Sequence, residues 1–351
     1  MSDIVKRSHG AGGEDMEWFI RNYVLKNLGG KVGDVPLEAL DDSAIIGDVV
    51  FTIDSHTVKP LFFPGGDIGR LAVCGTVNDI AVMGATPIAL SLALVVEEGL
   101  PLSTVDRVLQ SVALAANEAR VPVVTGDTKV VEQGGVDEMV VTTSAFGVRS
   151  KYLDRNIETI REFRDFENQW ITDSTLAKGD VIIVSGTIGD HGIALMAHRE
   201  GYGFEGELKS DIAPLNNLVE DLLAVGGITA MKDPTRGGLA TVLNEWADKS
   251  GVGIRVYEEK IPVREDVRAV AEMLGIDPLE VGNEGKIVIG CVKEMAEDVL
   301  AELKRHELGK NSCIIGEVAD DVEARYVVMR TSVGGDRVIE RPVADPVPRI
   351  C

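Results

Sequence analysis

The sequence predicts a mixed α/β (α+β) protein with two domains and an extended C-terminal tail. Apolar runs with strand character alternate with helical patterns along the chain, which is typical of α/β architectures. A length of 351 residues allows two domains, each with its own core. Residues 341–351 contain three prolines, which fix φ and remove donors, so this end can form neither a helix nor a central strand.

The first domain is expected to span residues 1–150. Strands are predicted at 49–53, 121–125 and 139–148, an apolar run lies at 88–96, and helices are predicted at 16–28, 68–83 and 103–119. The helix at 68–83 is apolar nearly all round, a pattern that indicates a buried helix. Its one acid, Asp79, cannot stay unpaired in a core, so it should cap another group or face a metal ion.

The second domain is expected at residues 177–339. A charged and aromatic connection, 151–176, precedes it and carries an insertion with a short helix near 157–166. Strands are predicted at 181–185, 286–292 and 314–318. Helices should end at His198 and cover 215–225, 238–249, 267–274 and 295–304. Residues 340–351 form the tail.

Composition excludes several classes of protein. The net charge of −22 argues against nucleic acid or an anionic membrane as the main partner. The four cysteines have no CxxC or zinc-site spacing, the N-terminus has no signal-peptide pattern, and no uninterrupted apolar run reaches transmembrane length. We therefore expect a protein of the reducing cytoplasm with free thiols.

The tail places a thiol at the very end of the chain. Its prolines favour an extended, polyproline-like arm that rises by about 3 Å per residue and reaches roughly 30 Å over ten residues. Cys351 at its tip is either a stray exposed cysteine or a swinging thiol that carries a group into an active site.

Acidic residues followed by small or hydroxylated residues recur in the first half of the chain. Mg²⁺ prefers such hard oxygen ligands and bridges carboxylates to substrate phosphates. A turn or helix cap is the alternative role for each acid taken alone. The candidates are Asp41, Asp42, Asp54, Asp79 and Asp127.

Two further segments could bind an anion. The glycine-rich turn at 8–14 can direct consecutive backbone N–H groups toward one, although most such turns have no ligand. The segment 232–238, Lys-Asp-Pro-Thr-Arg-Gly-Gly, precedes a helix, so Arg236 could clamp a phosphate at the helix N-terminus. An ordinary helix cap fits this segment equally well.

Taken in order, the motifs resemble the AIR synthase superfamily of ATP-using enzymes. They are HGAGGE, DDSA, TIDSHTV, GTVNDIAVMGATP, TGDTKVV, SGTIGDHG, DPTRGG, NEGK and the terminal PRIC, and they run through most of the chain. TIDSHTV, SGTIGDHG, DPTRGG and above all PRIC are similar to the HypE family of hydrogenase maturation factors. The connection at 151–176 is longer than the resemblance predicts.

This resemblance implies an AIR-synthase-like two-domain fold and a homodimer joined through a β-barrel of the N-terminal domains. It also implies binding of ATP with Mg²⁺ and dehydration of a carboxamide on the terminal thiol to a thiocyanate. HypF would donate the carboxamide, and a HypC–HypD scaffold would accept the cyanide for the iron of a [NiFe]-hydrogenase. Neither nucleic acid nor a membrane is implied as a partner.

The same resemblance implies roles for particular residues. Cys351 would carry the reacting group, Lys129 would be the cation near the transferred phosphoryl group, and Glu284 would be the base. The implied ATP- or phosphate-binding residues are Gly10, Gly12, Gly13, Asn78, Thr128 and Arg236. The implied metal ligands are Asp41, Asp42, Asp54, Asp79, Asp127 and Asp233.

Two alternative functions remain open at this point. One is another ATP-dependent enzyme of the superfamily, of the selenophosphate synthetase or small-molecule kinase type. The former normally has a reactive cysteine near its glycine-rich start, and the segment 8–13 has none. The other is a non-catalytic thiol carrier or metallochaperone that uses Cys351 only as a ligand.

Overall fold

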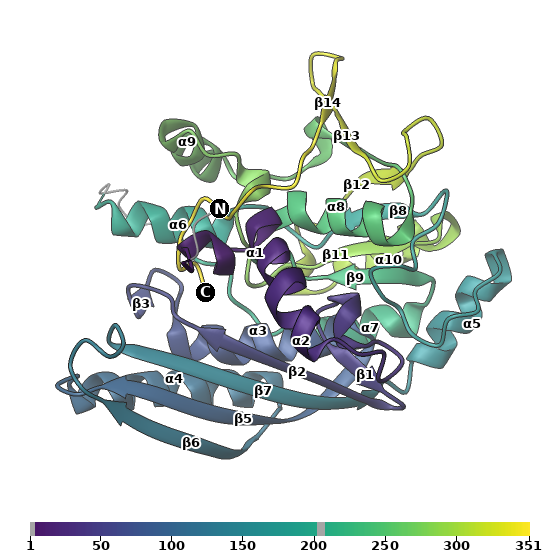
Figure 1. The fold of residues 1–351 in the computed structure, drawn as a ribbon. Helices are drawn as coiled ribbons and strands as arrows, with labels where there is room; N and C mark the ends of the chain where they lie inside the picture. Colours follow the sequence, from purple (N-terminus) through teal and green to yellow (C-terminus); the bar gives the residue numbers. More distant parts are fainter. Residues whose placement is uncertain (1–3, 202–207) are drawn as a thin grey trace.

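The computed structural model describes residues 4–201 and 208–351. A five-stranded sheet comes from the N-terminal half and a seven-stranded sheet from the C-terminal half (Figure 1). Helix α3 (Ile68–Val82) lies between them, since it packs on strands β2 and β7 of the first sheet and on β9 of the second. None of the helices in the described ranges is both long and apolar enough to span a membrane.

The N-terminal sheet has the strand order β1-β2-β7-β5-β6. Antiparallel pairing joins β2 to β7 and β7 to β5, whereas β6 runs parallel to β5 after the crossover helix α4 (Leu102–Ala119). The strands are β1 (Ala44–Ile46), β2 (Val49–His56), β5 (Ala85–Glu97), β6 (Val123–Val131) and β7 (Met139–Arg149). A small separate hairpin is formed by β3 (Phe62–Phe63) and β4 (Gly66–Asp67).

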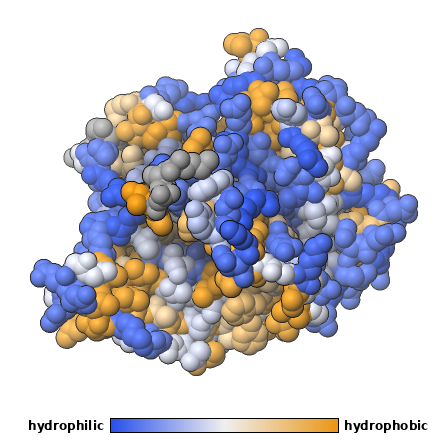
Figure 2. Space-filling model, viewed as in Figure 1, coloured by the Kyte–Doolittle hydropathy of each residue, from blue (hydrophilic) through white to orange (hydrophobic). Residues whose placement is uncertain are grey.

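The two faces of this sheet differ in their environment. Helix α3 packs on one face, where Val50 and Thr52 of β2 are buried. Alternate residues point the other way because successive side chains of a strand face opposite sides, and Phe51 and Ile53 are exposed there. Hydrophobic residues gather over these strands in the lower part of Figure 2. One face of the sheet is therefore apolar and uncovered in the single chain.

The C-terminal sheet has the order β14-β13-β10-β12-β8-β11-β9. On its interior strand β8, Ile182 and Val184 join the core cluster formed with α8, and Val181 and Ile183 join the larger cluster that contains α7 and α10. The strands are β8 (Val181–Val184), β9 (Ile228–Lys232), β10 (Ile254–Tyr257), β11 (Val288–Cys291), β12 (Cys313–Val318), β13 (Val327–Arg330) and β14 (Asp336–Val338). The helices of this half are α6 (Asp190–Arg199), α7 (Asn216–Val225), α8 (Gly238–Ser250), α9 (Glu265–Leu274) and α10 (Ala296–Leu303).

The predicted elements agree with the structure except in three places. The strand expected at 121–125 continues to Val131, so the segment 126–129 lies within β6 and not at a strand end. The helix expected at 16–28 is α1 (Gly13–Phe19), followed by a π-helical segment at 20–25 and one turn of α2 (Lys26–Leu28). The short strands β1, β3, β4, β9, β10, β13 and β14 were not predicted.

The tail has no helix or strand, as its prolines predict, but it lies against the protein. The carbonyl oxygens of Pro342 and Val343 accept hydrogen bonds from the backbone N–H groups of Glu14 and Asp15, both at 3.2 Å. Val347 and Ile350 are buried. The tail therefore runs from the start of α1 to the space between the two sheets.

Candidate functional site

A cavity of about 300 Å³ is lined by residues of α1, β2, α3 and α8. Segments from both halves of the chain line it, together with the last residue. Residues on its wall that could take part in chemistry are Asp41, Asp42, Asp54, Asp79, Lys232, Asp233, Arg236, Glu245, Lys249, Glu284 and Cys351.

Four carboxylates converge on this cavity from four separate elements. Asp42 precedes β1, Asp54 lies on β2, Asp79 on the last turn of α3, and Asp233 directly after β9. Burial raises the pKa of Asp42 to about 7 and that of Asp233 to about 6. Burial and then the neighbouring carboxylates, Asp233 first, raise the pKa of Asp79. A bound cation would relieve this repulsion.

The oxygen atoms of this group also fit a cation. Within the described ranges, the buried atoms Asp42 Oδ2 and Asp233 Oδ2 have no hydrogen-bond partner. Buried carboxylate oxygens without a donor suit a hard metal ion such as Mg²⁺, which takes several oxygen ligands and keeps part of its water. The residues present therefore fit Mg²⁺.

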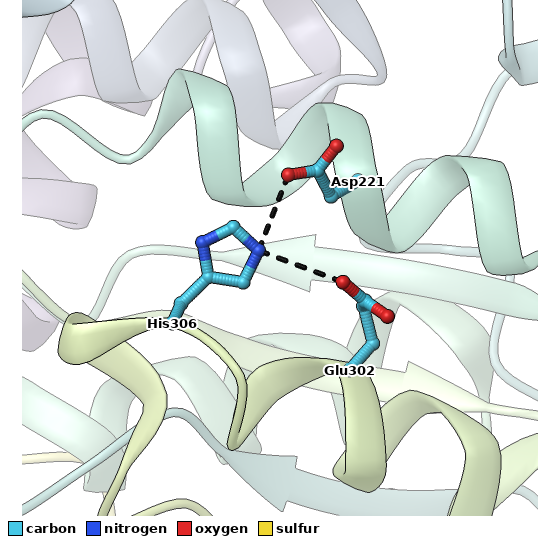
Figure 3. A group of neighbouring side chains, drawn as sticks. All are labelled: Asp221, Glu302 and His306. Carbon is cyan, nitrogen blue, oxygen red and sulfur yellow. Dashed lines mark ion pairs between the residues drawn. The ribbon is translucent and has the colours of Figure 1, made fainter.

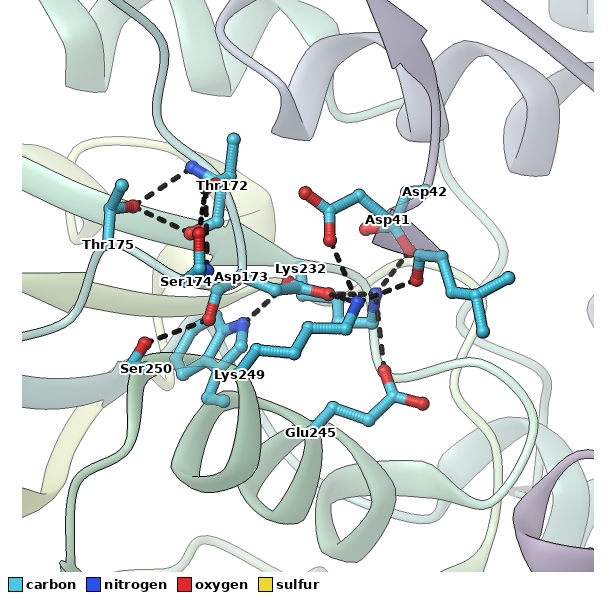
Figure 4. Close-up of polar contacts among 12 residues, drawn as sticks. Asp41, Asp42, Thr172, Asp173, Ser174, Thr175, Lys232, Glu245, Lys249 and Ser250 are labelled. Carbon is cyan, nitrogen blue, oxygen red and sulfur yellow. Dashed lines mark hydrogen bonds and ion pairs between the residues drawn. The ribbon is translucent and has the colours of Figure 1, made fainter. Parts of the chain in front are cut away.

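One end of the cavity is closed by two lysines that share one aspartate (Figure 4). Asp173 Oδ2 lies 3.0 Å from Lys232 Nζ and 2.6 Å from Lys249 Nζ, and its Oδ1 accepts a hydrogen bond of 2.8 Å from Trp246 Nε1. Lys232 also contacts Asp42 Oδ1 at 2.6 Å. We call this group the lysine end; its members are Asp41, Asp42, Asp173, Lys232 and Lys249.

Asp173, Lys232 and Lys249 hold one another in their charged forms, whereas burial raises the pKa of the neighbouring Asp42 to about 7. Burial favours the neutral form of Asp173, but the two ammonium groups outweigh it and hold its pKa well below the usual range. Burial likewise opposes the charge of Lys232, and the carboxylates of Asp173 and Asp42 outweigh it and raise its pKa. All three groups therefore stay charged at neutral pH. The sequence analysis did not find Asp173, Lys232 or Lys249.

The opposite end of the cavity holds the terminal thiol. Burial raises the pKa of Cys351, while the guanidinium of Arg236 acts against that shift. Burial and then the carboxylates of Asp233 and Asp54 raise the pKa of Glu284, whose buried Oε1 has no partner among the described residues. We call this group the thiol end; its members are Asp54, Asp79, Arg236, Glu284 and Cys351.

Arg236 is the cation of the thiol end. The Cys351 thiol contributes most to raising its pKa, and Asp54 and Glu284 add to this effect. No hydrogen bond from its guanidinium to any described residue is present, so its donors are available to an anion in the cavity.

The glycine-rich segment at the start of α1 lets the tail and Arg236 approach its backbone closely. Gly12 and Gly13 line the cavity with φ of 73° and 71°, in the left-handed region that favours glycine. A Cβ on Gly13 would lie 2.1 Å from the Pro342 carbonyl oxygen, and one on Gly12 would lie 2.8 Å from Arg236 Cβ. These glycines let the tail and Arg236 pack against the start of α1.

Several predicted residues lie outside the cavity. Gly10 is exposed and does not line it. Asn78 is buried nearby, but its amide donates to Ala213 O at 3.1 Å and accepts from Leu215 N at 2.8 Å, so it ties α3 to the start of α7. Both ends of its amide bind backbone here, and its predicted role in binding ATP or phosphate stays a prediction.

The segment 126–129 also lies outside the cavity. Asp127, Thr128 and Lys129 are on β6, an edge strand that is exposed over nearly its full length. Lys129 Nζ is 2.7 Å from Asp127 Oδ2, and their side chains are 66% and 63% exposed. In the single chain these residues lie apart from the other acids, because β6 ends one side of the sheet, and their predicted roles stay predictions.

A further group with metal-ligand atoms lies apart from the cavity, between α7 and α10 (Figure 3). His306 Nε2 is 3.2 Å from Asp221 Oδ2 and 3.7 Å from Glu302 Oε1. The imidazole lies between the two carboxylates at the surface, and the Asp221 side chain is 54% exposed. We interpret the group as a surface ion-pair cluster.

Comparison with known proteins agrees with this arrangement. The AIR synthase related protein N-terminal domain matches residues 40–149, and the corresponding C-terminal domain matches residues 177–328. The carbamoyl dehydratase HypE of Azotobacter vinelandii is 44% identical over 99% of this chain and 97% of its own length. The chain belongs to the HypE family of AIR synthase related proteins.

Solved structures of the HypE family share the fold. The HypE of a HypE–HypF complex superposes with a TM-score of 0.83 at 43% identity, covering 92% of this chain and 99% of that one. A hydrogenase maturation protein HypE in complex with ATP gives a TM-score of 0.79 at 38% identity, covering 99% and 100%. The predicted mixed α/β, AIR-synthase-like fold is confirmed.

Proposed function

We propose that this protein dehydrates a carboxamide on its own Cys351 to a thiocyanate, with ATP as the phosphoryl donor. The observation that carries the proposal is the position of the terminal thiol. Cys351 lines the same cavity as Arg236, Glu284 and the convergent carboxylates. The HypE relatives, named carbamoyl dehydratases, and the ATP complex of one HypE support this chemistry.

The reaction balances as two coupled steps. The carboxamide oxygen attacks the γ-phosphorus of ATP, an O–P bond forms, the bond to ADP breaks, and the nitrogen loses one proton. The C–O bond to phosphate then breaks and the C≡N bond forms. The second N–H proton leaves with the phosphate, so the products are thiocyanate, ADP, hydrogen phosphate and the first proton, which the base has taken up. Phosphorylation is needed because an amide oxygen is otherwise a poor leaving group.

The residues of the thiol end fit these steps. Glu284 is buried and its pKa is raised, which makes its carboxylate a stronger base than an exposed glutamate, and Arg236 favours the ionised form that can accept the first amide proton. Arg236 has free donors beside the thiol and can hold the oxygen or the phosphoryl group as negative charge develops.

The acids would hold Mg²⁺ with the phosphates. Asp41, Asp42, Asp54, Asp79 and Asp233 are the residues of this chain that would bind it. Bound Mg²⁺ neutralises phosphate charge and orients the transferred group. Lys232 and Lys249 keep the far wall charged and fixed, so the acids between the two ends are held in place before the nucleotide binds.

We further propose a homodimer in which the partner subunit's β6 completes the site. The uncovered apolar face of the N-terminal sheet would be buried between two copies. Asp127, Thr128 and Lys129 would then serve the neighbouring cavity, with Lys129 as the cation near the transferred phosphoryl group. Gly10 and Asn78 would contribute only through the backbone around them.

Mixing two inactive variants tests this division. In a heterodimer of Lys129→Ala with Glu284→Gln, one of the two sites has both wild-type residues if they come from different chains. Random mixing should then restore up to about one quarter of the wild-type sites. If both residues act within one chain, every site lacks one of them and no activity returns.

Partners and location follow as proposals from the same chemistry. HypF would supply the carboxamide, in line with the HypE–HypF complex, and a HypC–HypD scaffold would accept the cyanide for a [NiFe]-hydrogenase. All four cysteines are free, which suits the cytoplasm. We also propose that the chain divides into an N-terminal domain (1–150), a connection (151–176), a C-terminal domain (177–339) and a tail (340–351).

ADP formation tests the proposed function. Protein carbamoylated on Cys351 should release one ADP per tail in the presence of Mg²⁺ and ATP, whereas unmodified protein and Cys351→Ala should release none. A small-molecule kinase would release ADP without the modified tail, and a thiol carrier would release none from either form.

A further inference from the structure

The last residue is bound through its carboxylate and also lines the cavity. An oxygen of the Cys351 α-carboxylate accepts a hydrogen bond of 3.0 Å from the backbone N–H of Thr57 and one of 3.3 Å from its Oγ1. Thr57 directly follows β2, the strand that carries Asp54. We propose that Thr57 is a receptor for a free C-terminal carboxylate, and that this contact sets how far the thiol reaches into the cavity.

The tail binds Thr57 through both its N–H group and its carbonyl group. The Thr57 carbonyl oxygen accepts a 2.7 Å hydrogen bond from Arg349 Nε, so the tail contacts both the donor and the acceptor of this peptide segment. Arg349 has a φ of 52°, in the left-handed region, which turns the chain sharply just before its end. Arg349 Nη1 is held by Asp137 Oδ2 at 2.6 Å. The terminal turn is therefore specified by several contacts.

The residues before Cys351 are recognised through their backbone. Arg199 donates from Nη1 to the Pro348 carbonyl and from Nη2 to the Arg349 carbonyl, both at 2.6 Å. His191 Nε2 contacts the Ile350 carbonyl at 2.9 Å. A carbonyl can only accept, so Nε2 carries the proton and Nδ1 accepts from a hydroxyl 2.8 Å away, that of Ser210. Three consecutive carbonyls are thereby fixed.

These contacts fix the position of each tail residue relative to the terminal carboxylate. With the three carbonyls and the carboxylate each bound, the thiol has one position along the tail. Hydrogen bonds to a charged acceptor are about twice as strong as those between neutral groups, so replacing the carboxylate by an amide should weaken docking about fivefold to tenfold. This effect is chemical, since an amide has nearly the same size as a carboxylate.

The inference rests on the proposed function only in taking Cys351 as the reacting thiol. Its test needs neither ATP nor a carboxamide donor. Full-length protein is prepared by semisynthesis with a free carboxylate, an amide, or one added glycine at the end. The rate of Cys351 alkylation by iodoacetamide is read from the mass of the tail peptide.

Protection is the alkylation rate of the matching free tail peptide divided by the rate of the protein. The free peptide is the reference because the α-carboxylate itself changes the reactivity of the neighbouring thiol. We expect protection of Cys351 to fall about fivefold to tenfold in the amidated protein, and further with the added glycine. Equal protection of the carboxylate and amide forms overturns the proposal.

Substitution of the receptor gives an independent measurement. Thr57→Val keeps the branched shape but removes Oγ1, and Thr57→Ser keeps the hydroxyl. Protection should fall in the valine variant, return in the serine variant, and become less sensitive to amidation in the valine variant. If valine and serine protect Cys351 equally, the hydroxyl takes no part in binding the carboxylate. Circular dichroism confirms that both variants are folded.

Discussion

Both ends of the cavity combine acidic and basic residues, but the two ends differ in how these charges are paired. At the lysine end, two ammonium groups surround Asp173, and every charge has a partner within 3.0 Å. At the thiol end, Arg236 is the cation beside Asp54, Asp79 and Glu284, and the pKa values of Asp79 and Glu284 are raised. Asp173 and its two lysines are held in their charged forms, whereas the thiol end, like the neighbouring Asp42, has carboxylates that a bound cation would stabilise.

The largest expected effect is at the thiol end. Glu284→Gln keeps the size of the side chain but cannot accept a proton, so thiocyanate formation should fall at least about a hundredfold. The variant should still bind ATP and accept the carboxamide. Glu280→Gln is the matched control, because Glu280 does not line the cavity. Thiocyanate formation at the wild-type rate in Glu284→Gln would exclude this residue as the base.

A large effect on stability is expected at the lysine end. Asp173→Asn leaves Lys232 and Lys249 with less compensation in a buried site, which should lower the free energy of unfolding by about 3–5 kcal/mol. Urea unfolding measures the change. An unfolding midpoint equal to that of wild type would show that the lysines are neutralised by other groups.

The opposite sign is expected for Asp79→Asn. Removing one negative charge from the thiol end relieves repulsion, and Asn can still accept the 3.0 Å hydrogen bond from Thr52 Oγ1. The variant should be at least as stable as wild type without divalent cations, while its affinity for ATP in the presence of Mg²⁺ falls. If Asp79→Asn were destabilised as much as Asp173→Asn, the two ends would not differ in their electrostatic contribution to stability.

A smaller effect concerns the pH dependence of tail docking. Asp345 accepts hydrogen bonds from Gly237 N at 2.8 Å and Val347 N at 2.7 Å, yet burial raises its pKa to about 6. The docked state therefore favours the protonated form, and docking should weaken as pH rises from about 4 to about 6 and then level off.

Protection of Cys351 from alkylation, relative to the free tail peptide, measures this dependence. Asp345→Asn cannot titrate and should give a flat profile. Arg236 opposes the shift of Asp345, and Glu280 adds to it. An equally steep pH dependence in Asp345→Asn would assign it to another group.

Much of the thiol end could be predicted from the sequence. Asp54, Asp79, Arg236 and Glu284 each lie in a short motif at the end of an element, and such positions in an α/β protein often face a common site. The tail could also be predicted to lack helix and strand from its prolines. Its docking could not, because the contacts of Arg199 and His191 are with backbone atoms and leave no pattern in the tail sequence.

The lysine end was missed for a different reason. Asp173 belongs to an irregular connection without hydrophobic periodicity, so its burial is decided by tertiary packing against Trp246. One signal was available. Lys232 ends an otherwise apolar strand, and a lysine buried there requires an acidic partner. Asp127 and Lys129 could not be placed from one chain, because an edge strand can serve a neighbouring subunit.

The most direct test of the account is the mass of the tail peptide after one turnover. Protein carbamoylated on Cys351 is mixed with Mg²⁺ and ATP, quenched and digested. The account predicts a tail peptide lighter by one water molecule, in an amount equal to the ADP formed. ADP formation with a tail peptide of unchanged mass, or loss of the carboxamide without a thiocyanate, would contradict the central claim that Cys351 carries the dehydrated group.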